Sequence, residues 1–351
     1  MKTVNYNRVI AACFLAIMGF AVSCGKNTST VVVDKPDTAV NGLTPYNILY
    51  PAHFPPMNIP EDNQPYKERI ELGRMLYYDN ILSNDGRACA SCHFQSYGFT
   101  IPGMVNNMPV LSHVNLAWHD KYMWDGSKTG SLEDVMLFET QEFFATNLEK
   151  INSSAKYKAL FKQYFGVDYI THHEIAYALA QFTRTMISRD TKYDRYIKGT
   201  GTLSYNEEMG RMIFFSEKGD CFHCHTALIF TDGRMHNTGL DSLYNKEADK
   251  GYYNVTKNPA DLGKFRTPNL RNVALRNYFM HDGRFTSLEQ VIDFYDHGVR
   301  KVSNIDPIMT KEGKGNGLKL TVVEKQQLIS FLKTLTDEAF ITDTSFSKPT
   351  Y

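Results

Sequence analysis

The sequence predicts a mainly α-helical protein that consists of two similar units in tandem, with few or no strands. In five segments, apolar residues recur at steps of three and four, which is the period of a helix packed on one face. These segments are 67–78, 174–187, 206–215, 287–295 and 322–334. No long alternation of polar and apolar residues, which would indicate a half-buried strand, occurs in the sequence.

Five landmarks of the first half recur in the same order in the second half. The pairs are ELGRMLYY and EMGRMIFF, two Cys-x-x-Cys-His motifs, two Pro-x-Leu triplets, YMWDG and FMHDG, and SLEDV and SLEQV. Such ordered self-similarity indicates two copies of one unit. A cluster of Gly and Thr at 199–202 lacks an apolar period and marks a boundary. We therefore expect an N-terminal unit at 61–200 and a C-terminal unit at 201–345.

The length and composition agree with two globular units. The chain has 351 residues, which fits about two domains of roughly 150 residues each. Its residues are 42% hydrophobic and 22% charged, so a mainly disordered or collagen-like chain is excluded. Thirty-eight basic residues balance 38 acidic ones. Because general nucleic-acid binders carry a positive excess, we expect no nucleic-acid partner.

Residues 1–24 have the layout of a secretory signal. Basic residues precede an apolar run at 9–22, which is shorter than the about 20 residues that a membrane-spanning helix needs. The run ends in small residues before Cys24, as in a bacterial lipoprotein signal, although Ala21 stands where leucine is usual. We expect an exported, periplasmic or cell-envelope protein that is lipid-anchored through Cys24, with ordinary signal cleavage as the alternative. Residues 25–60 are expected to form a tether.

The remaining four cysteines lie in the two Cys-x-x-Cys-His motifs. The motifs are Cys89, Cys92 and His93, and Cys221, Cys224 and His225. Two cysteines at this spacing can bind the two vinyl groups of one haem as thioethers, while the adjacent histidine reaches the iron. A zinc site is the alternative for paired cysteines, but zinc would take its four ligands from both pairs and leave each histidine incidental. The motifs therefore predict two covalently bound haem c groups, with a histidine as the proximal ligand of each.

With these motifs the chain resembles the bacterial dihaem cytochrome c peroxidases, the family that includes MauG, over about residues 60–340. The resemblance rests on ELGRMLYYD, CASCH, YMWDGS, CFHCH, FRTPNLRNV, FMHDGRFTSLEQVIDFY and LISFLKTLTD in this order. It implies two cytochrome c-like haem domains in tandem. The N-terminal domain would react with hydrogen peroxide, and the C-terminal domain would take electrons from a small donor protein such as a cytochrome c. Whether the chain forms a homodimer is left open.

The resemblance also implies two catalytic residues. Trp124 matches the tryptophan that lies between the two haems and carries a hole from one to the other. Cleavage of peroxide needs an acid/base close to the reactive iron, and the family uses a glutamate that follows the tryptophan. Glu142, followed by Phe143, is the preferred candidate, and Glu139 is the alternative. The competing interpretation for both glutamates is a solvated helix face.

In the family that the chain resembles, the distal ligand of the second haem lies shortly after the segment that corresponds to SLEQV. The register of SLEQV leads to Tyr295, where many members of the family carry methionine and MauG-like members carry tyrosine. A phenolate is a harder ligand than a thioether and favours ferric and higher oxidation states. Met309 is the competing ligand, and a tyrosine buried in the core of an amphipathic helix is the structural alternative.

Two further expectations come from the resemblance. Gated members block the peroxidatic haem with a histidine in the loop after the first motif. No histidine lies between His93 and His113, and His113 stands where the family carries asparagine, so we expect the first haem to be open. Asn107, with the backbone carbonyls of Arg276 and Tyr278, matches an interdomain calcium site, so one calcium ion is a further expectation.

The first functional hypothesis is an exported dihaem peroxidase that reduces hydrogen peroxide to water with electrons from a cytochrome c-like donor. The second is a MauG-like oxidase that uses peroxide to oxidise an organic or protein substrate, which the tyrosine and the missing blocking histidine favour. The third is a non-catalytic dihaem electron carrier, which would hold if neither iron had an open coordination site.

Overall fold

The computed structural model describes residues 42–227, 229–310 and 317–350, together with the backbone of 31–34. The predicted signal and Cys24 lie outside these residues, as do residues 25–30 and 35–41 of the predicted tether. The rest of the predicted tether is described, and its side chains Ile48, Tyr50 and Phe54 are buried in a hydrophobic cluster. No helix within the described part of the chain is both long and apolar enough to cross a membrane.

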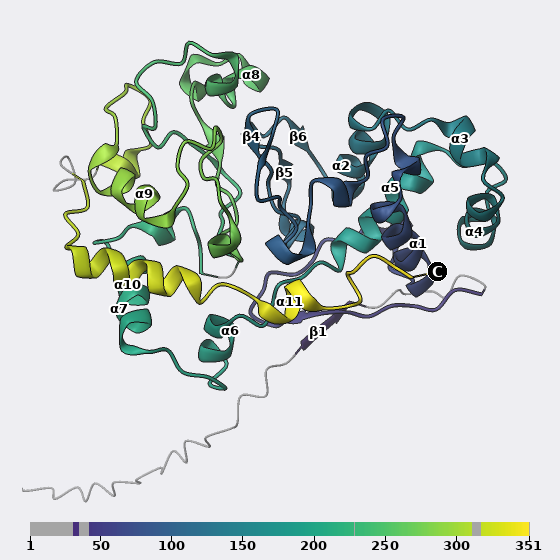
Figure 1. The fold of residues 1–351 in the computed structure, drawn as a ribbon, viewed down its shortest axis with the longest axis horizontal. Coiled ribbons are helices and arrows are strands. Elements are labelled where there is room, and N and C mark those ends of the chain that lie inside the picture. Colours follow the sequence, from purple (N-terminus) through teal and green to yellow (C-terminus); the bar gives the residue numbers. More distant parts are fainter. Residues whose placement is uncertain (1–30, 35–41, 228, 311–316, 351) are drawn as a thin grey trace, which may run out of the picture.

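Two helical bodies lie side by side (Figure 1). The N-terminal body is built around α1 (Lys67–Tyr78) and α5 (His172–Arg184), and the C-terminal body around α7 (Tyr205–Phe214) and α10 (Val322–Lys333). The other helices are α2 (Leu132–Phe138), α3 (Leu148–Ser153), α4 (Ala155–Phe165), α6 (Lys192–Ile197), α8 (Tyr253–Thr256), α9 (Leu288–Asp293) and α11 (Glu338–Thr342). The predicted mainly helical fold is confirmed.

Each body has a close helix crossing at the same place in the repeat. In the N-terminal body Gly73 faces α5, and a Cβ atom at this position would lie 1.9 Å from the carbonyl oxygen of Ala178. In the C-terminal body Gly210 faces α10, and its Cβ atom would lie 1.9 Å from the carbonyl oxygen of Gln327. Only glycine therefore permits these backbone contacts.

A separate hydrophobic core surrounds each crossing. The largest fully buried side chains of the first core include Leu72, Leu76, Phe99, Phe161 and Phe182. Those of the second core include Phe214, Phe230, Phe331, Leu328 and Leu335. The second core is strongly aromatic, with Phe214 and Phe331 ring centroids 5.2 Å apart.

Side-chain hydroxyl groups cap most of the longer helices. Thr171, Ser204 and Thr321 accept hydrogen bonds at the N-termini of α5, α7 and α10, and each helix has a glutamate three residues later that completes a capping box. These pairs satisfy backbone N–H groups that would otherwise lack partners.

Strands are short and occur only in pairs among the described residues. The antiparallel pairs are β1 (Val31–Asp34) with β2 (Ile48–Pro51), β3 (Met104–Val105) with β4 (Met108–Pro109), β5 (Lys121–Tyr122) with β6 (Lys128–Thr129), and β7 (Met235–His236) with β8 (Phe265–Arg266). The three pairs of two-residue strands hold neighbouring loop segments together and do not form a larger sheet.

The segment after α10 crosses back to the N-terminal body. There the ring of Phe340 on α11 lies 5.4 Å from the ring of Phe99, and the ring of Phe346 lies 6.3 Å from it. The Gln95 side chain donates hydrogen bonds to the carbonyl oxygens of Phe340 and Asp343 at 3.3 and 2.7 Å. Residues 338–347 therefore complete the first core, although they follow the C-terminal body in the sequence.

We expect Gly210→Ala to lower the free energy of unfolding by about 1–3 kcal/mol or more, since the new methyl group must push α7 away from α10. Denaturant unfolding of the haem-loaded protein measures this change. Gly103→Ala is the control, because a Cβ atom there meets nothing within 4 Å. Equal stability of the two variants would contradict the role of the close crossing.

Candidate functional site

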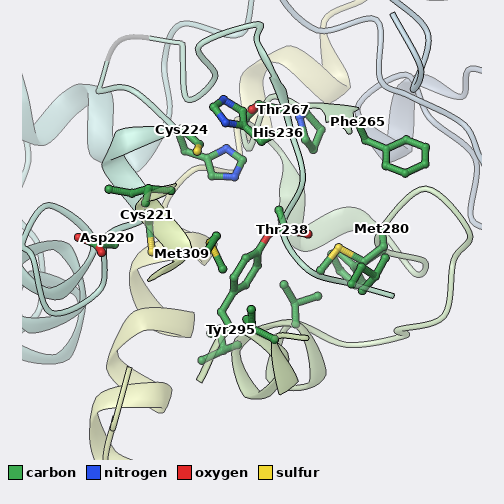
Figure 2. A pocket seen from close by; sticks show the side chains of 18 of the residues that line it. Asp220, Cys221, Cys224, His236, Thr238, Phe265, Thr267, Met280, Tyr295 and Met309 are labelled. Atoms are coloured by element: carbon green, nitrogen blue, oxygen red, sulfur yellow. The ribbon is translucent and has the colours of Figure 1, made fainter. Parts of the chain in front are cut away.

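The second Cys-x-x-Cys-His motif opens on a large cavity of the C-terminal body. A short loop after α7 leads to a 3₁₀ turn that begins at Cys221. Cys224 and His225 follow this turn. The cavity has a volume of about 710 Å³ (Figure 2). It is lined by the motif residues, by Tyr295, Met309 and Arg276, and by Trp124 from the N-terminal body. A cavity of this size can hold a cofactor.

Both motif histidines are held for ligation through Nε2. Nδ1 of His93 donates to the carbonyl oxygen of Phe99 at 2.8 Å, and Nδ1 of His225 donates to that of Phe230 at 3.0 Å. Such a bond fixes the tautomer and the ring orientation of a metal-binding histidine. Burial lowers the pKa of both imidazoles, to about 4 for His93. Each histidine is therefore neutral and ready to bind a metal.

The cysteines fit haem attachment better than zinc. All four are free of disulfide bonds. Among the described residues, three groups of His, Cys, Asp and Glu come close enough to share a metal ion, and none contains both cysteines of one motif. A structural zinc site would need the four ligands to converge.

Two arginines at the cavity, the buried Arg266 and the half-buried Arg276, carry positive charges that could bind the propionates of a haem. Arg266 donates to the carbonyl oxygen of Met123 and to Nδ1 of His119, and Arg276 donates to the carbonyl oxygen of Val110. Both line the cavity, and burial lowers the pKa of both to about 10. Within the described part of the chain, neither guanidinium is paired with a carboxylate. A haem with two propionates would neutralise them, so the residues fit this cofactor.

Trp124 belongs to the N-terminal body but reaches the cavity of the C-terminal body. It lies between β5 and β6, is buried, and donates from Nε1 to the carbonyl oxygen of Pro109 at 2.8 Å. Its own carbonyl oxygen accepts a hydrogen bond from the backbone N–H of Arg266 at 2.9 Å. Trp124 is thus fixed from both bodies, as a residue between two cofactors would be.

Both candidate distal ligands of the second haem line the same cavity. The ring of Tyr295 points into it, and Met309 lies nearby (Figure 2). Burial, together with the nearby Cys224 and Cys221, raises the pKa of the Tyr295 hydroxyl well above its usual value. A phenolate there therefore needs a positive partner such as a ferric iron.

The glutamates near the first motif are placed in opposite environments. Glu139 is half-buried and lies close to Cys89 and Cys92, where burial raises the pKa of both thiols and the charge of Glu139 raises it further. Burial raises the pKa of Glu139 itself to about 7, against the opposing effect of Lys128. Glu142 is 66% exposed and lies 3.4 Å from the Lys128 ammonium group. Of the two candidates, the preferred Glu142 thus lies in solvent, and the alternative Glu139 lies next to the motif cysteines.

Comparisons with known proteins agree with this arrangement. The sequence matches the di-haem cytochrome c peroxidase family over residues 67–202. It is 31% identical over 328 residues to cytochrome-c peroxidase IdrP1 of Pseudomonas sp. (strain SCT), which covers 81% of this chain and 85% of that protein. The chain belongs to the di-haem cytochrome c peroxidase family. It is thus a peroxidase-like oxidoreductase, and the predicted family is confirmed.

Other relatives include both branches of this family. Methylamine utilization protein MauG of Methylophilus methylotrophus is 29% identical, with 84% of this chain and 93% of that protein covered. A MauG-like protein associated with microbial copper homeostasis has a crystal structure that superposes with a TM-score of 0.77 at 31% identity, over 85% of this chain and 98% of that one. The diheme peroxidase BthA of Burkholderia thailandensis E264 shares the fold, with a TM-score of 0.67.

The di-haem peroxidase fold places Glu139 and Tyr295 at equivalent positions. Counting from SLEDV and SLEQV, each is the ninth residue from the serine. α2 continues into a short π-helix at Glu139–Phe143, and α9 continues into one at Phe294–Gly298. Such π turns frequently occur at functional sites. The repeat register was the signal that would have selected Glu139 from the sequence.

His113 lies beside the proximal ligand of the first motif. Its ring stacks on that of His93 with centroids 3.4 Å apart and an interplanar angle of 20°. The Tyr77 hydroxyl lies 3.1 Å from its Nδ1 atom. His113 therefore packs against the predicted proximal ligand, and an open first haem remains a prediction.

The three predicted calcium ligands belong to segments that lie near one another. Asn107 is exposed in the turn between β3 and β4, with a φ of 60°. This hairpin approaches the segment that contains Arg276 and Tyr278, because a Cβ atom at Gly283 would meet the sulfur of Met104. The calcium ion itself remains a prediction.

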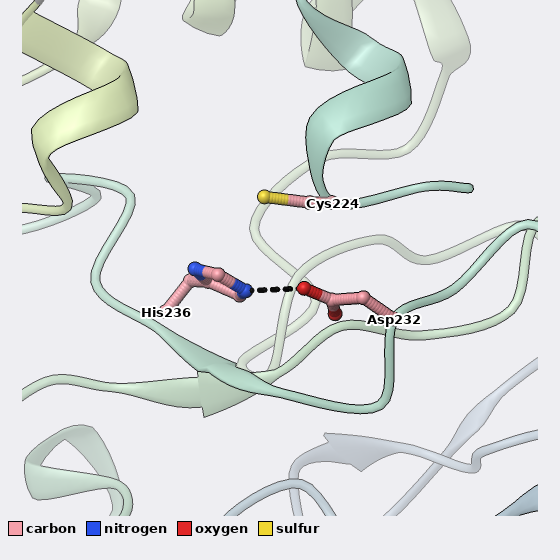
Figure 3. A group of neighbouring side chains, drawn as sticks. All are labelled: Cys224, Asp232 and His236. Carbon is pink, nitrogen blue, oxygen red and sulfur yellow. Dashed lines mark hydrogen bonds and ion pairs between the residues drawn. The ribbon is translucent and has the colours of Figure 1, made fainter.

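A histidine clamp beside the second motif was not foreseen from the sequence. His236 lies 2.8 Å from Asp232 and close to Cys224 (Figure 3), and 2.5 Å from Asp306 on its other face. Although burial alone would lower its pKa, hydrogen bonds to Asp232, Cys224 and Asp306 raise it to about 11. Asp306 also accepts the backbone N–H of Met309. The clamp therefore holds the His236 ring between two carboxylates and anchors the segment that leads to Met309.

We expect Glu139→Gln to lower kcat/KM for hydrogen peroxide by about 10²–10⁴-fold, whereas Glu142→Gln stays near the parent value. In the parent enzyme the rate should rise with pH through about 7, because only the ionised carboxylate can accept the peroxide proton. Stopped-flow kinetics across this pH range measures both effects. A slow Glu142→Gln enzyme beside a normal Glu139→Gln enzyme would restore the original assignment.

The ligand of the second haem can be identified with two variants. We expect Tyr295→Phe to remove a phenolate-to-iron absorption band and to change the low-spin EPR signal, because its oxygen would be the lost ligand. Met309→Leu should leave both signals intact. The reverse pattern would identify Met309 as the ligand.

Proposed function

We propose that this protein is an exported dihaem peroxidase that reduces hydrogen peroxide to water with electrons from a small donor protein such as a cytochrome c. The observation that carries the proposal is Glu139, a half-buried carboxyl group beside the first motif whose pKa burial raises to about 7. General acid/base catalysis is most effective when the pKa lies near the working pH.

The residues that would hold the two haem c groups are the two pairs of motif cysteines, with His93 and His225 as proximal ligands. When bound, haem supplies an iron that can cleave the O–O bond of peroxide and exchange single electrons. The carbonyl oxygens of Phe99 and Phe230 hold the histidine rings in place. The buried Arg266 and the half-buried Arg276 would bind the propionates.

Glu139 is assigned the proton transfer at the first site. Its carboxylate would accept a proton from one oxygen of the peroxide and return it to the other oxygen, which leaves as water. Lys128 opposes the rise in the pKa of Glu139 and thereby keeps part of the carboxyl ionised at neutral pH. The complete reaction consumes one peroxide, two electrons and two protons and yields two waters.

Trp124 is assigned the electron relay between the two sites. It is buried, lines the second cavity and is hydrogen-bonded to both bodies. The second site, with Tyr295 as the proposed ligand, would receive electrons from the donor protein and pass them through this indole.

A MauG-like oxidase that acts on an organic or protein substrate is the second candidate. The tyrosine in the second cavity and the position of His113 beside the proximal ligand favour it. The family relation favours an enzyme over a non-catalytic electron carrier.

Export, a lipid anchor at Cys24 and an interdomain calcium ion belong to the same proposal. The signal-like residues 1–24 support export, and the small residues before Cys24 support lipidation. The bound calcium would be held by Asn107 and the carbonyl oxygens of Arg276 and Tyr278.

The test is a peroxide titration of the diferric protein, followed by optical and EPR spectroscopy and repeated with reduced cytochrome c. We expect the diferric protein to react without prior reduction, because no distal histidine blocks the first site, and to oxidise two reduced cytochromes per peroxide. A long-lived oxidised state that reduced cytochrome does not discharge would favour the MauG-like oxidase. No reaction before or after partial reduction would contradict both enzymes.

A further inference from the structure

A chain of aromatic rings leads from the second cavity to the surface at α6. Phe214 lines the cavity, and its ring centroid lies 4.9 Å from that of Phe215. The ring of Tyr193 lies 6.2 Å from Phe215, and the ring of Tyr196 lies 6.3 Å from Tyr193. Two tyrosines on one helix thus extend the packing of the cavity outwards.

A parallel set of contacts joins Tyr193 to the proximal side of the same site. Its ring lies 5.7 Å from Phe230 and 5.3 Å from Phe331. The carbonyl oxygen of Phe230 accepts the hydrogen bond from His225. Phe230 therefore contacts Tyr193 through its ring and His225 through its backbone carbonyl oxygen.

The two tyrosines are held rigidly against the C-terminal body. Between them on α6, Asp194 accepts two hydrogen bonds of 2.7 Å from the Arg271 guanidinium, and both side chains are fully buried. Asp194 also caps its own helix through Thr191. Breaking such a buried pair would be strongly destabilising, so α6 cannot drift away from the second site.

Tyr196 is the outermost ring of this aromatic series, and its surroundings favour the loss of a proton together with an electron. It is half-buried, and it lies near Glu208 on α7, whose pKa is lowered by Arg211 and, to a smaller extent, by the Tyr196 side chain. The Arg211 guanidinium lies 5.7 Å from the ring centroid and pairs with Glu208. The Glu208 carboxylate can accept the proton of the Tyr196 phenol. The Arg211 cation disfavours an oxidised ring that keeps this proton, because such a ring is also positively charged.

The surface next to Tyr196 is unusually apolar. Tyr205 and Met212 flank Glu208 at three and four residues along α7, so the three side chains share one face. Tyr205 is 74% exposed and Met212 is 51% exposed. A molecule too large for the cavity can therefore approach Tyr196.

We propose that Tyr196 is a surface site of one-electron oxidation that the second haem site drives through Tyr193. The Tyr196 phenol gives one electron to the oxidised second site through Tyr193 and its proton to Glu208, and becomes a neutral radical. The radical then takes one electron and one proton from an external phenol, such as a tyrosine of a protein substrate, which leaves as a phenoxyl radical. Glu208 releases its proton to the solvent before the next cycle. Two such cycles supply the two electrons that one peroxide consumes. This inference rests on the peroxide reaction proposed above and names phenols as the substrate class.

The experiment uses the protein with both haems, hydrogen peroxide as the oxidant and a nitroso spin trap, with mass spectrometry of the labelled peptides. We expect a trap adduct on Tyr196 in the parent protein. Tyr196→Phe should lose this adduct and retain its oxidised optical spectrum for longer. Tyr193→Phe, which keeps the ring and removes only the phenol, should also lose the adduct on Tyr196.

Tyr169→Phe is the matched control. Tyr169 is 48% exposed and donates to Glu149 at 3.1 Å, but it makes no ring contact with another aromatic side chain among the described residues. Its replacement should leave the Tyr196 adduct and the optical decay unchanged.

The outcomes separate this inference from the proposed function. An adduct on Tyr196 that persists in Tyr193→Phe would overturn the relay. A protein that consumes peroxide and changes its haem spectrum without labelling Tyr196 would overturn the surface site and leave the peroxidase intact. The absence of any spectral change with peroxide would overturn both.

Discussion

Backbone contact between paired helices determines where each haem motif begins. The glycine in each helix before a motif lets the chain approach a second helix so closely that any side chain would strike a carbonyl oxygen. From this glycine the chain runs 16 residues to Cys89 in the first unit and 11 residues to Cys221 in the second. Gly219 adds a further close approach, since its Cβ atom would lie against the carbonyl oxygen of Ile213, just before Cys221. The direction of the motif, and hence of the proximal histidine, depends on these contacts.

The duplication gives the two units equivalent positions and lets different side chains occupy them. Glu139 in the first unit corresponds to Tyr295 in the second, so one backbone site provides a proposed acid/base in one cavity and a proposed iron ligand in the other. Trp124 corresponds to His281. His281 is buried in the second cavity, 3.1 Å from Asp249 and stacked on Phe265. The asymmetric chemistry therefore arises from substitutions on a common scaffold.

The sequence predicted those features that depend on residues close together in the chain. Helical periodicity located α1, α5, α7, α9 and α10 to within a few residues, and the spacing of the cysteines identified both attachment motifs. It was less informative where the chain folds back on itself. Glu142 was preferred by counting from Trp124, whereas the π-helix turns Glu139 inwards and Glu142 to solvent. The clamp on His236 joins it to Asp306, 70 residues away, which no local pattern could indicate.

The return of residues 338–347 to the first core has a consequence for biosynthesis. Phe99 positions His93 through its carbonyl oxygen and packs against Phe340 and Phe346, and Gln95 bonds to Asp343, 248 residues away. During vectorial synthesis the first motif therefore emerges long before the segment that covers it. Its cysteines remain accessible to the haem-attachment machinery throughout that interval, and the closing segment arrives after the second motif has also emerged. The order of the chain thus sets a schedule in which cofactor insertion can precede final closure of the first unit.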